Sequence, residues 1–129
     1  MTLLVPAALG LMAGAAIAAS GGGAGRDRDR IPVAVPDGPA RNCVSIALLR
    51  ESVVRSDRVI DFVTGNHRAY RVVLPQDCPE LGFEQRFAYE TSLSELCSTD
   101  IITVLHEAPL SRGASCGLAK FQPVILPHR

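Results

Sequence analysis

The sequence predicts a small, mainly β domain that is cross-linked by disulfides. In several short runs β-branched and aromatic residues alternate with polar ones, a period of two that is typical of half-buried strands. The even set of four cysteines suits a disulfide framework. We therefore expect a small antiparallel barrel or sandwich of five to six short strands, preceded by a short N-terminal helical segment.

Residues 1–19 form an uncharged run rich in Ala, Gly and Leu, which ends in a small-x-small site at Ala16 to Ala18. This pattern predicts a secretory signal peptide, although the basic start of such peptides is missing. The alternative is an uncleaved membrane anchor, which needs roughly 20 strongly apolar residues. Pro6, Gly10 and Gly14 dilute the run, so we favour cleavage and a periplasmic or secreted location.

Residues 20–40 are predicted to be a flexible linker, because a glycine run is followed by alternating Arg and Asp and then by three closely spaced prolines. Residues 41–126 then make up the domain, and residues 127–129 form a tail. All six aromatic residues fall inside this domain, so we expect its core there.

The strongest local pattern in the domain is a β-hairpin. The runs 58–63 and 70–74 flank residues 64–68, where Gly65 and Asn66 tolerate positive φ. Pro123 would place the last strand at a sheet edge, because proline cannot donate to a ladder. The helical segment is expected at 44–50, and the other strands at 51–55, 86–91, 101–106 and 120–125.

The wide spacing of Cys43, Cys78, Cys97 and Cys116 disfavours zinc, whose ligands usually come in pairs two to four residues apart. Disulfides are the alternative, and they persist in oxidising compartments. If successive strands run up and down, the 78–97 and 97–116 pairs lie at opposite strand ends, roughly 20 Å apart. This leaves Cys43 with Cys97 and Cys78 with Cys116, provided that the loop 108–115 does not carry Cys116 back.

The formal net charge is +0, which argues against nucleic-acid binding, since such proteins carry a basic excess. Five arginines on or beside the predicted strands could form one anion-binding face. The simpler interpretation is that they form solvated cross-strand pairs with acids such as Asp57, Asp61 and Glu90. The five arginines are Arg55, Arg58, Arg68, Arg71 and Arg86.

No residue pattern predicts a catalytic, cofactor or metal site. His67 is expected in the hairpin turn, His106 on the more exposed side of a strand, and His128 in the tail, so they make no local triad. The carboxylates of Asp77, Glu80 and Glu84 cluster in an expected surface loop that suits a calcium or polymer contact but lacks an EF-hand pattern. Asp100 is expected to bond nearby backbone amides in a turn.

Three cysteine-containing motifs carry one family resemblance. They are Tyr70-x-x-x-Leu74-Pro75-x-x-Cys78-Pro79-x-Leu81, Leu96-Cys97-x-x-Asp100-x-Ile102-x-Val104 and Cys116-x-Leu118-x-x-Phe121-x-Pro123. Over 43–124 the chain resembles a family of small exported bacterial proteins of unknown function. Leu118-Ala119-Lys120-Phe121 departs from that family's Leu-Gly-x-Phe. The resemblance implies export and the cysteine framework, and no chemistry.

Together these observations predict an exported, non-enzymatic binding or structural accessory of the cell envelope, with an envelope protein or polymer as its partner. Contact with a membrane is expected only through an uncleaved leader. The alternative is a small secreted hydrolase or hydrolase inhibitor, in which His106 with Glu107 and Glu84 would be the first residues to test.

Overall fold

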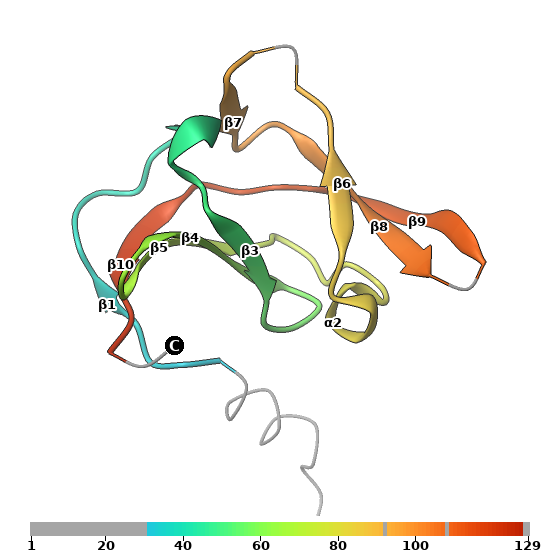
Figure 1. The fold of residues 1–129 in the computed structure, drawn as a ribbon, viewed down its shortest axis with the longest axis horizontal. Helices are drawn as coiled ribbons and strands as arrows, with labels where there is room; N and C mark the ends of the chain where they lie inside the picture. The colour runs from blue at the N-terminus through green and yellow to red at the C-terminus, as the bar shows by residue number, and fades with distance from the viewer. Residues whose placement is uncertain (1–30, 92, 108, 128–129) are drawn as a thin grey trace, which may run out of the picture.

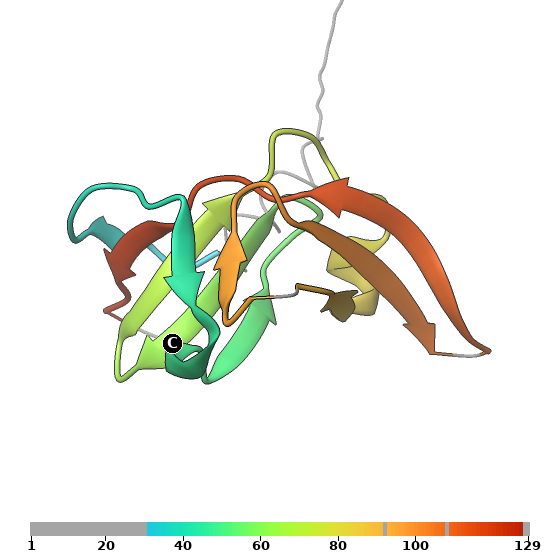
Figure 2. The ribbon, with the colours of Figure 1, turned by 90° about the horizontal axis from the view of Figure 1, so that it is seen from above.

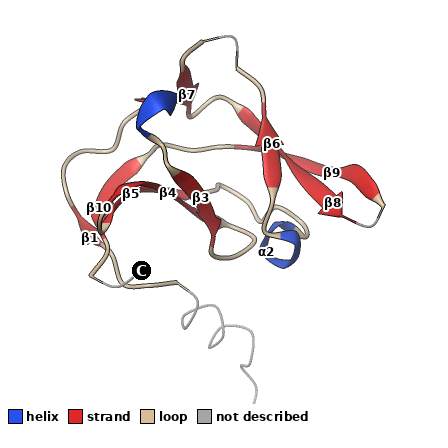
Figure 3. Cartoon of the chain, in the orientation of Figure 1, coloured by secondary structure: helices blue, strands red, loops and turns tan. Residues whose placement is uncertain are grey.

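The computed structural model describes residues 31–91, 93–107 and 109–127, and shows a chain built almost entirely of antiparallel strands (Figures 1 and 3). The helices among these residues are the 3-10 turn η1 (Ile46–Leu48) and the one-turn α2 (Leu81–Glu84). Neither helix is long or apolar enough to cross a membrane. The strands are β1 (Val35–Pro36), β2 (Cys43–Ser45), β3 (Glu51–Val54), β4 (Val59–Gly65), β5 (Arg68–Val73), β6 (Phe87–Tyr89), β7 (Glu95–Cys97), β8 (Ile101–Glu107), β9 (Leu110–Gly117) and β10 (Gln122–Ile125).

A five-stranded sheet in the order β1-β10-β5-β4-β3 forms the base of the molecule. Its centre is the predicted hairpin, in which β4 pairs with β5 from Val59↔Val73 to Gly65↔Arg68. Asn66 and His67 make the turn, and its positive φ falls on His67 (φ 60) rather than on Gly65 or Asn66. The hairpin is thus confirmed, with both strands close to their expected bounds.

The remaining strands form two smaller sheets, β2-β7 and β6-β8-β9. Figure 2 shows the long β8–β9 hairpin extending away from the five-stranded sheet. The mainly β, antiparallel class is therefore confirmed, whereas the expected barrel is not formed by the described residues. The expected number of strands was too low, because the four strands β1, β2, β7 and β9 carry too little alternation to be recognised.

One hydrophobic core joins all three sheets. Ile60 and Phe62 of β4 are fully buried, as are Leu96 of β7 and Ile102 of β8. The Phe62 ring lies edge-on to Phe87 of β6, with centroids 6.1 Å apart. The smaller sheets thus cover one face of the five-stranded sheet.

The opposite face of the five-stranded sheet is covered by the chain that leads into it. A second buried cluster there contains Val63, Ala69 and Leu126, with Ala34 packed against it. Further along, β1 adds two residues to the sheet beside β10. The described end of the expected linker is therefore part of the domain. The expected signal peptide, the rest of that linker and His128 lie outside the described residues.

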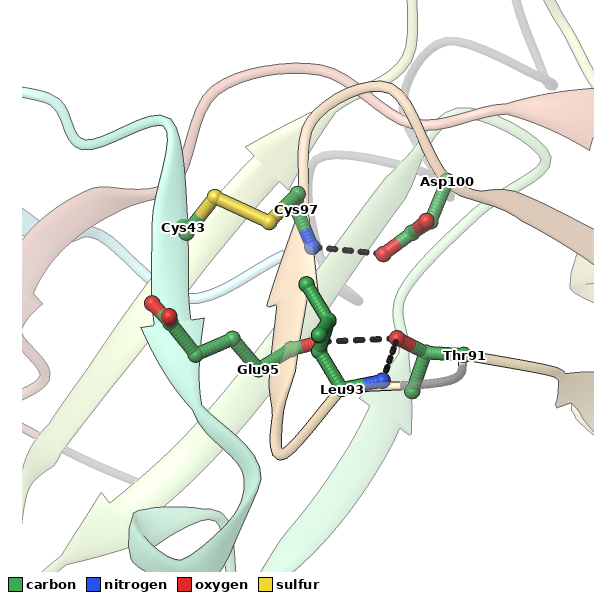
Figure 4. Close-up of a disulfide and its surroundings, with 6 residues drawn as sticks. All are labelled: Cys43, Thr91, Leu93, Glu95, Cys97 and Asp100. Atoms are coloured by element: carbon green, nitrogen blue, oxygen red, sulfur yellow. Dashed lines mark hydrogen bonds between the residues drawn. A yellow bond between two sulfur atoms is a disulfide. The ribbon is translucent and has the colours of Figure 1, made fainter.

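Two disulfides cross-link the domain, Cys43–Cys97 and Cys78–Cys116, which is the predicted pairing. The up-and-down strand argument behind that prediction was wrong, because residues 110–117 form β9. This strand runs back along β8 and places Cys116 opposite Ile102, at the start of β8. Figure 4 shows the first disulfide joining directly opposite residues of β2 and β7, with Asp100 accepting a 2.7 Å hydrogen bond from the Cys97 amide. The disulfides are typical of an oxidising compartment.

Two local expectations need correction. Pro123 is not at an edge, because β10 lies between β1 and β5. Its carbonyl accepts a hydrogen bond from Asp37, so its missing amide donor also faces the β1 side and costs no bond to β5. Within the expected helical segment 44–50, the structure has the end of β2 followed by the single turn η1.

Candidate functional site

The most unusual surface feature is the turn that contains α2. Leu81 and Gly82 are buried, whereas Phe83 is 85% exposed. Glu80 and Gln85, which bracket the helix, both have left-handed backbones (φ 69 and 58). Such conformations are disfavoured for residues other than glycine and persist only where the surroundings enforce them. We call residues 80–85 the α2 knuckle.

Two contacts hold the α2 knuckle against the body of the protein. Cys78, just before it, is fully buried and bonded to Cys116 of β9. The Gly82 amide donates a 2.7 Å hydrogen bond to Asp57 Oδ1 in the β3–β4 turn. A Cβ at Gly82 would lie 2.9 Å from that oxygen, so glycine is needed for this close approach. Phe83 is therefore displayed on a fixed support.

His106 of β8 supplies a third contact to the knuckle. Its Nε2 lies 3.1 Å from a carboxylate oxygen of Glu80, and its Nδ1 lies 3.7 Å from one of Glu84. The sequence predicted this histidine on the more exposed side of its strand. Instead it shares the alternation of the buried Val104 and faces the knuckle, with its side chain 28% exposed.

The imidazole ring of His106 fits because β9 has a glycine beneath it. A Cβ at Gly113 would lie only 2.5 Å from His106 Nε2. The β8–β9 register also shifts between Thr103 and Leu105, a bulge-like irregularity opposite this glycine. Irregularities of this kind often re-aim a side chain. Gly113 and the bulge thus seat His106 against the knuckle.

Phe83 stands between two surface hollows. One hollow, of about 500 Å³, has Asp57, Arg58 and Asp77 in its lining together with Phe83. The other, of about 560 Å³, has Glu84, His106 and Glu107 in its lining, again with Phe83. We call Phe83 and these two hollows the Phe83 surface. The structure thereby brings together Glu84, His106 and Glu107, the three residues named for the hydrolase alternative.

The geometry of this cluster suits contact better than chemistry. Glu80 and Glu84 lie against different nitrogens of the His106 ring, so one ion bound to either nitrogen would miss one carboxylate. Within the described part of the chain, no group of three His, Cys, Asp or Glu side chains is placed to hold a metal. Ser111 is the cross-strand neighbour of His106, but Nε2, the nitrogen that would activate it, faces Glu80.

The five arginines of the expected anion-binding face are engaged by acceptors within the protein. Arg55 and Arg71 both bind Asp61, which is completely buried on the face of the sheet away from the main core. Arg71 also donates to the carbonyl of Pro32, which ties down the chain leading into β1. These two arginines serve the fold.

The other three arginines each have a different acceptor. Arg58 donates to the carbonyls of Leu74 and Pro75. Arg68 lies 3.7 Å from Asp37, and Arg86 lies 3.3 Å from Glu107. Every one of the five therefore already has an acceptor within the protein. His67 is engaged as well, since its Nδ1 is 3.0 Å from the Leu126 carbonyl.

Sequence reasoning missed Phe83, because it assigned all aromatic residues to the core. A signal was present, since Phe83 falls outside every alternating run and follows Pro79 and Gly82, which favour a turn. The loop carboxylates were recognised from the sequence, but they lie on two different sides of Phe83. Glu80 and Glu84 contact His106, whereas Asp77 lines the hollow on the other side of Phe83.

Comparisons with known proteins add no relative: no family model matches the chain, and no curated protein or solved structure gives a significant match. The resemblance to small exported bacterial proteins therefore stays a prediction.

Proposed function

We propose that this chain is a non-enzymatic binding module of the periplasm or the secreted space, and that it binds an envelope component through the Phe83 surface. The observation that carries the proposal is the 85% exposure of Phe83, a large aromatic residue, on a turn that a disulfide and a partly buried hydrogen bond hold in place. Exposed aromatic side chains flanked by polar residues are typical anchors of protein interfaces.

Rigidity of the α2 knuckle supports the same proposal. Binding costs free energy when side chains and loops must be ordered, and a fixed support removes part of that cost. The neighbouring hollows give a partner room to enclose the ring on both sides, and a desolvated pocket is where an aromatic anchor contributes most.

Site-specific photo-crosslinking in the native host tests this proposal. Phe83 is replaced by the photoreactive benzoylphenylalanine, and the matched control carries it at Ile101, a 57% exposed residue at the start of β8 that lines neither hollow. We expect a discrete covalent adduct from position 83 and none from position 101. No adduct at position 83, or the same adducts from both positions, would refute the assignment of this surface.

A further inference from the structure

We infer that the partner of the Phe83 surface is a basic polypeptide, whose arginine or lysine side chains enter the two hollows while apolar groups cover Phe83. This inference rests on the proposed function and adds the chemistry of the partner. It comes from the charges that surround an exposed apolar anchor.

Carboxylates outnumber cations around Phe83. The side chains lining the two hollows include one arginine, Arg58, in the described chain. They also include four carboxylates, two in each hollow: Asp57, Asp77, Glu84 and Glu107.

Internal contacts leave this excess in place. Arg58 donates hydrogen bonds to backbone carbonyls rather than to these carboxylates. Arg86 pairs with one of the four carboxylates, Glu107, through an exposed contact of 3.3 Å. Glu80, at the start of the knuckle, adds a further carboxylate beside His106. Since the whole chain is formally neutral, the negative potential here reflects local placement rather than overall composition.

The aromatic ring and the carboxylates suit the same ligand group. A guanidinium or ammonium is attracted to the face of an aromatic ring as well as to carboxylates. Phe83 lines both hollows, so a cation in either one lies beside the ring and beside two acids. An acidic partner would instead place like charges together, which disfavours binding.

Three matched synthetic peptides test the inference. They share the sequence Gly-Ser-Leu-X-Leu-X-Ser-Gly, in which X is arginine, glutamine or glutamate, and they are titrated into the isotopically labelled oxidised domain while backbone amide resonances are followed by NMR. We expect the arginine peptide to shift the amides of Phe83, Glu84 and Glu107. We expect the glutamine peptide to bind at least about threefold more weakly, and the glutamate peptide to bind weakest of all.

Charge variants of the protein localise the effect. The double variant Asp77→Asn, Glu107→Gln removes one exposed carboxylate from each hollow and should weaken the arginine peptide about threefold or more. Glu95→Gln, which removes an exposed carboxylate on β7, is the control and should bind as the parent does. Raising the salt concentration should abolish the difference between the double variant and the parent.

The outcomes separate the two proposals. Equal binding of the arginine and glutamine peptides, or no effect of the double variant, overturns the inference of a basic partner. If Phe83→Ala then still abolishes peptide binding, the Phe83 surface stands as a binding site. Absence of any arginine-peptide shift near Phe83 also overturns the basic partner, and the crosslinking result then decides the proposed function separately.

Discussion

Removing the buried carboxylate of Asp61 should be among the most destabilising single changes in the domain. Asp61 is 0% exposed and accepts hydrogen bonds of 2.8 to 2.9 Å from Arg55 and Arg71, whose side chains are 12% and 14% exposed. In Asp61→Asn, two largely buried guanidiniums lose their counter-ion. Breaking a buried ion pair from one side costs about 3–5 kcal/mol, a large part of the roughly 5–15 kcal/mol that stabilises a typical domain.

Urea unfolding at neutral pH, followed by circular dichroism, measures this loss. The control is Asp37→Asn, because the Asp37 contact with Arg68 is long (3.7 Å) and both side chains are well exposed (44% and 68%). That pair should contribute no more than about 1 kcal/mol. If Asp61→Asn lowers the free energy of unfolding by no more than the control does, the buried charge cluster is not what holds this face of the sheet.

Two further predictions concern the disulfides and the seat of His106. Stepwise reduction should open Cys43–Cys97 before Cys78–Cys116, because thiolate attack needs access to sulfur and Cys78 is fully buried. Differential alkylation followed by mass spectrometry gives the order of opening. Simultaneous opening of the two disulfides would contradict the prediction. Gly113→Ala should destabilise the domain by about 1 kcal/mol in urea unfolding, the low end for overpacking, because the partly exposed His106 ring can move away from the new Cβ. Adding His106→Ala should relieve most of that loss, whereas Gly117→Ala, with nothing within 4 Å of its new Cβ, is the control.

The parts of the fold that sequence reasoning recovered are those where side-chain period and turn chemistry agree. The β4–β5 hairpin combines alternation on both strands with the turn residues Gly65 and Asn66, although the positive φ of the turn falls on the next residue, His67. Strand β9 gave no such signal, because its Ser, Gly and Ala residues are poor strand formers and its burial does not alternate. Strand β1 contains Pro36 and, among the described strands, pairs with β10 alone.

The burial of Asp61 and the exposure of Phe83 are set by tertiary packing, which a local sequence pattern does not show. Alternation and cross-strand pairing predicted Asp61 beside an arginine, and the structure pairs it with Arg71. Its burial, however, depends on Pro32 and Ala34 folding back over that face of the sheet. Likewise, hydrophobicity alone sends Phe83 to the core, and although Pro79 and Gly82 signal a turn, they do not show which of its side chains faces solvent.

The exposed ring, rather than the left-handed backbone beside it, makes the α2 knuckle the best candidate for function. His67 and Glu80 are each the third residue of a four-residue turn, in Glu80's case after Pro79, and Gln85 ends α2. A left-handed backbone is common at both kinds of position. The exposure of Phe83 has no such local reason, and leaving the ring outside the core forgoes roughly 1.5–3 kcal/mol of burial. In a small domain that two disulfides cross-link, this loss of stability is best accounted for by what the exposed ring binds.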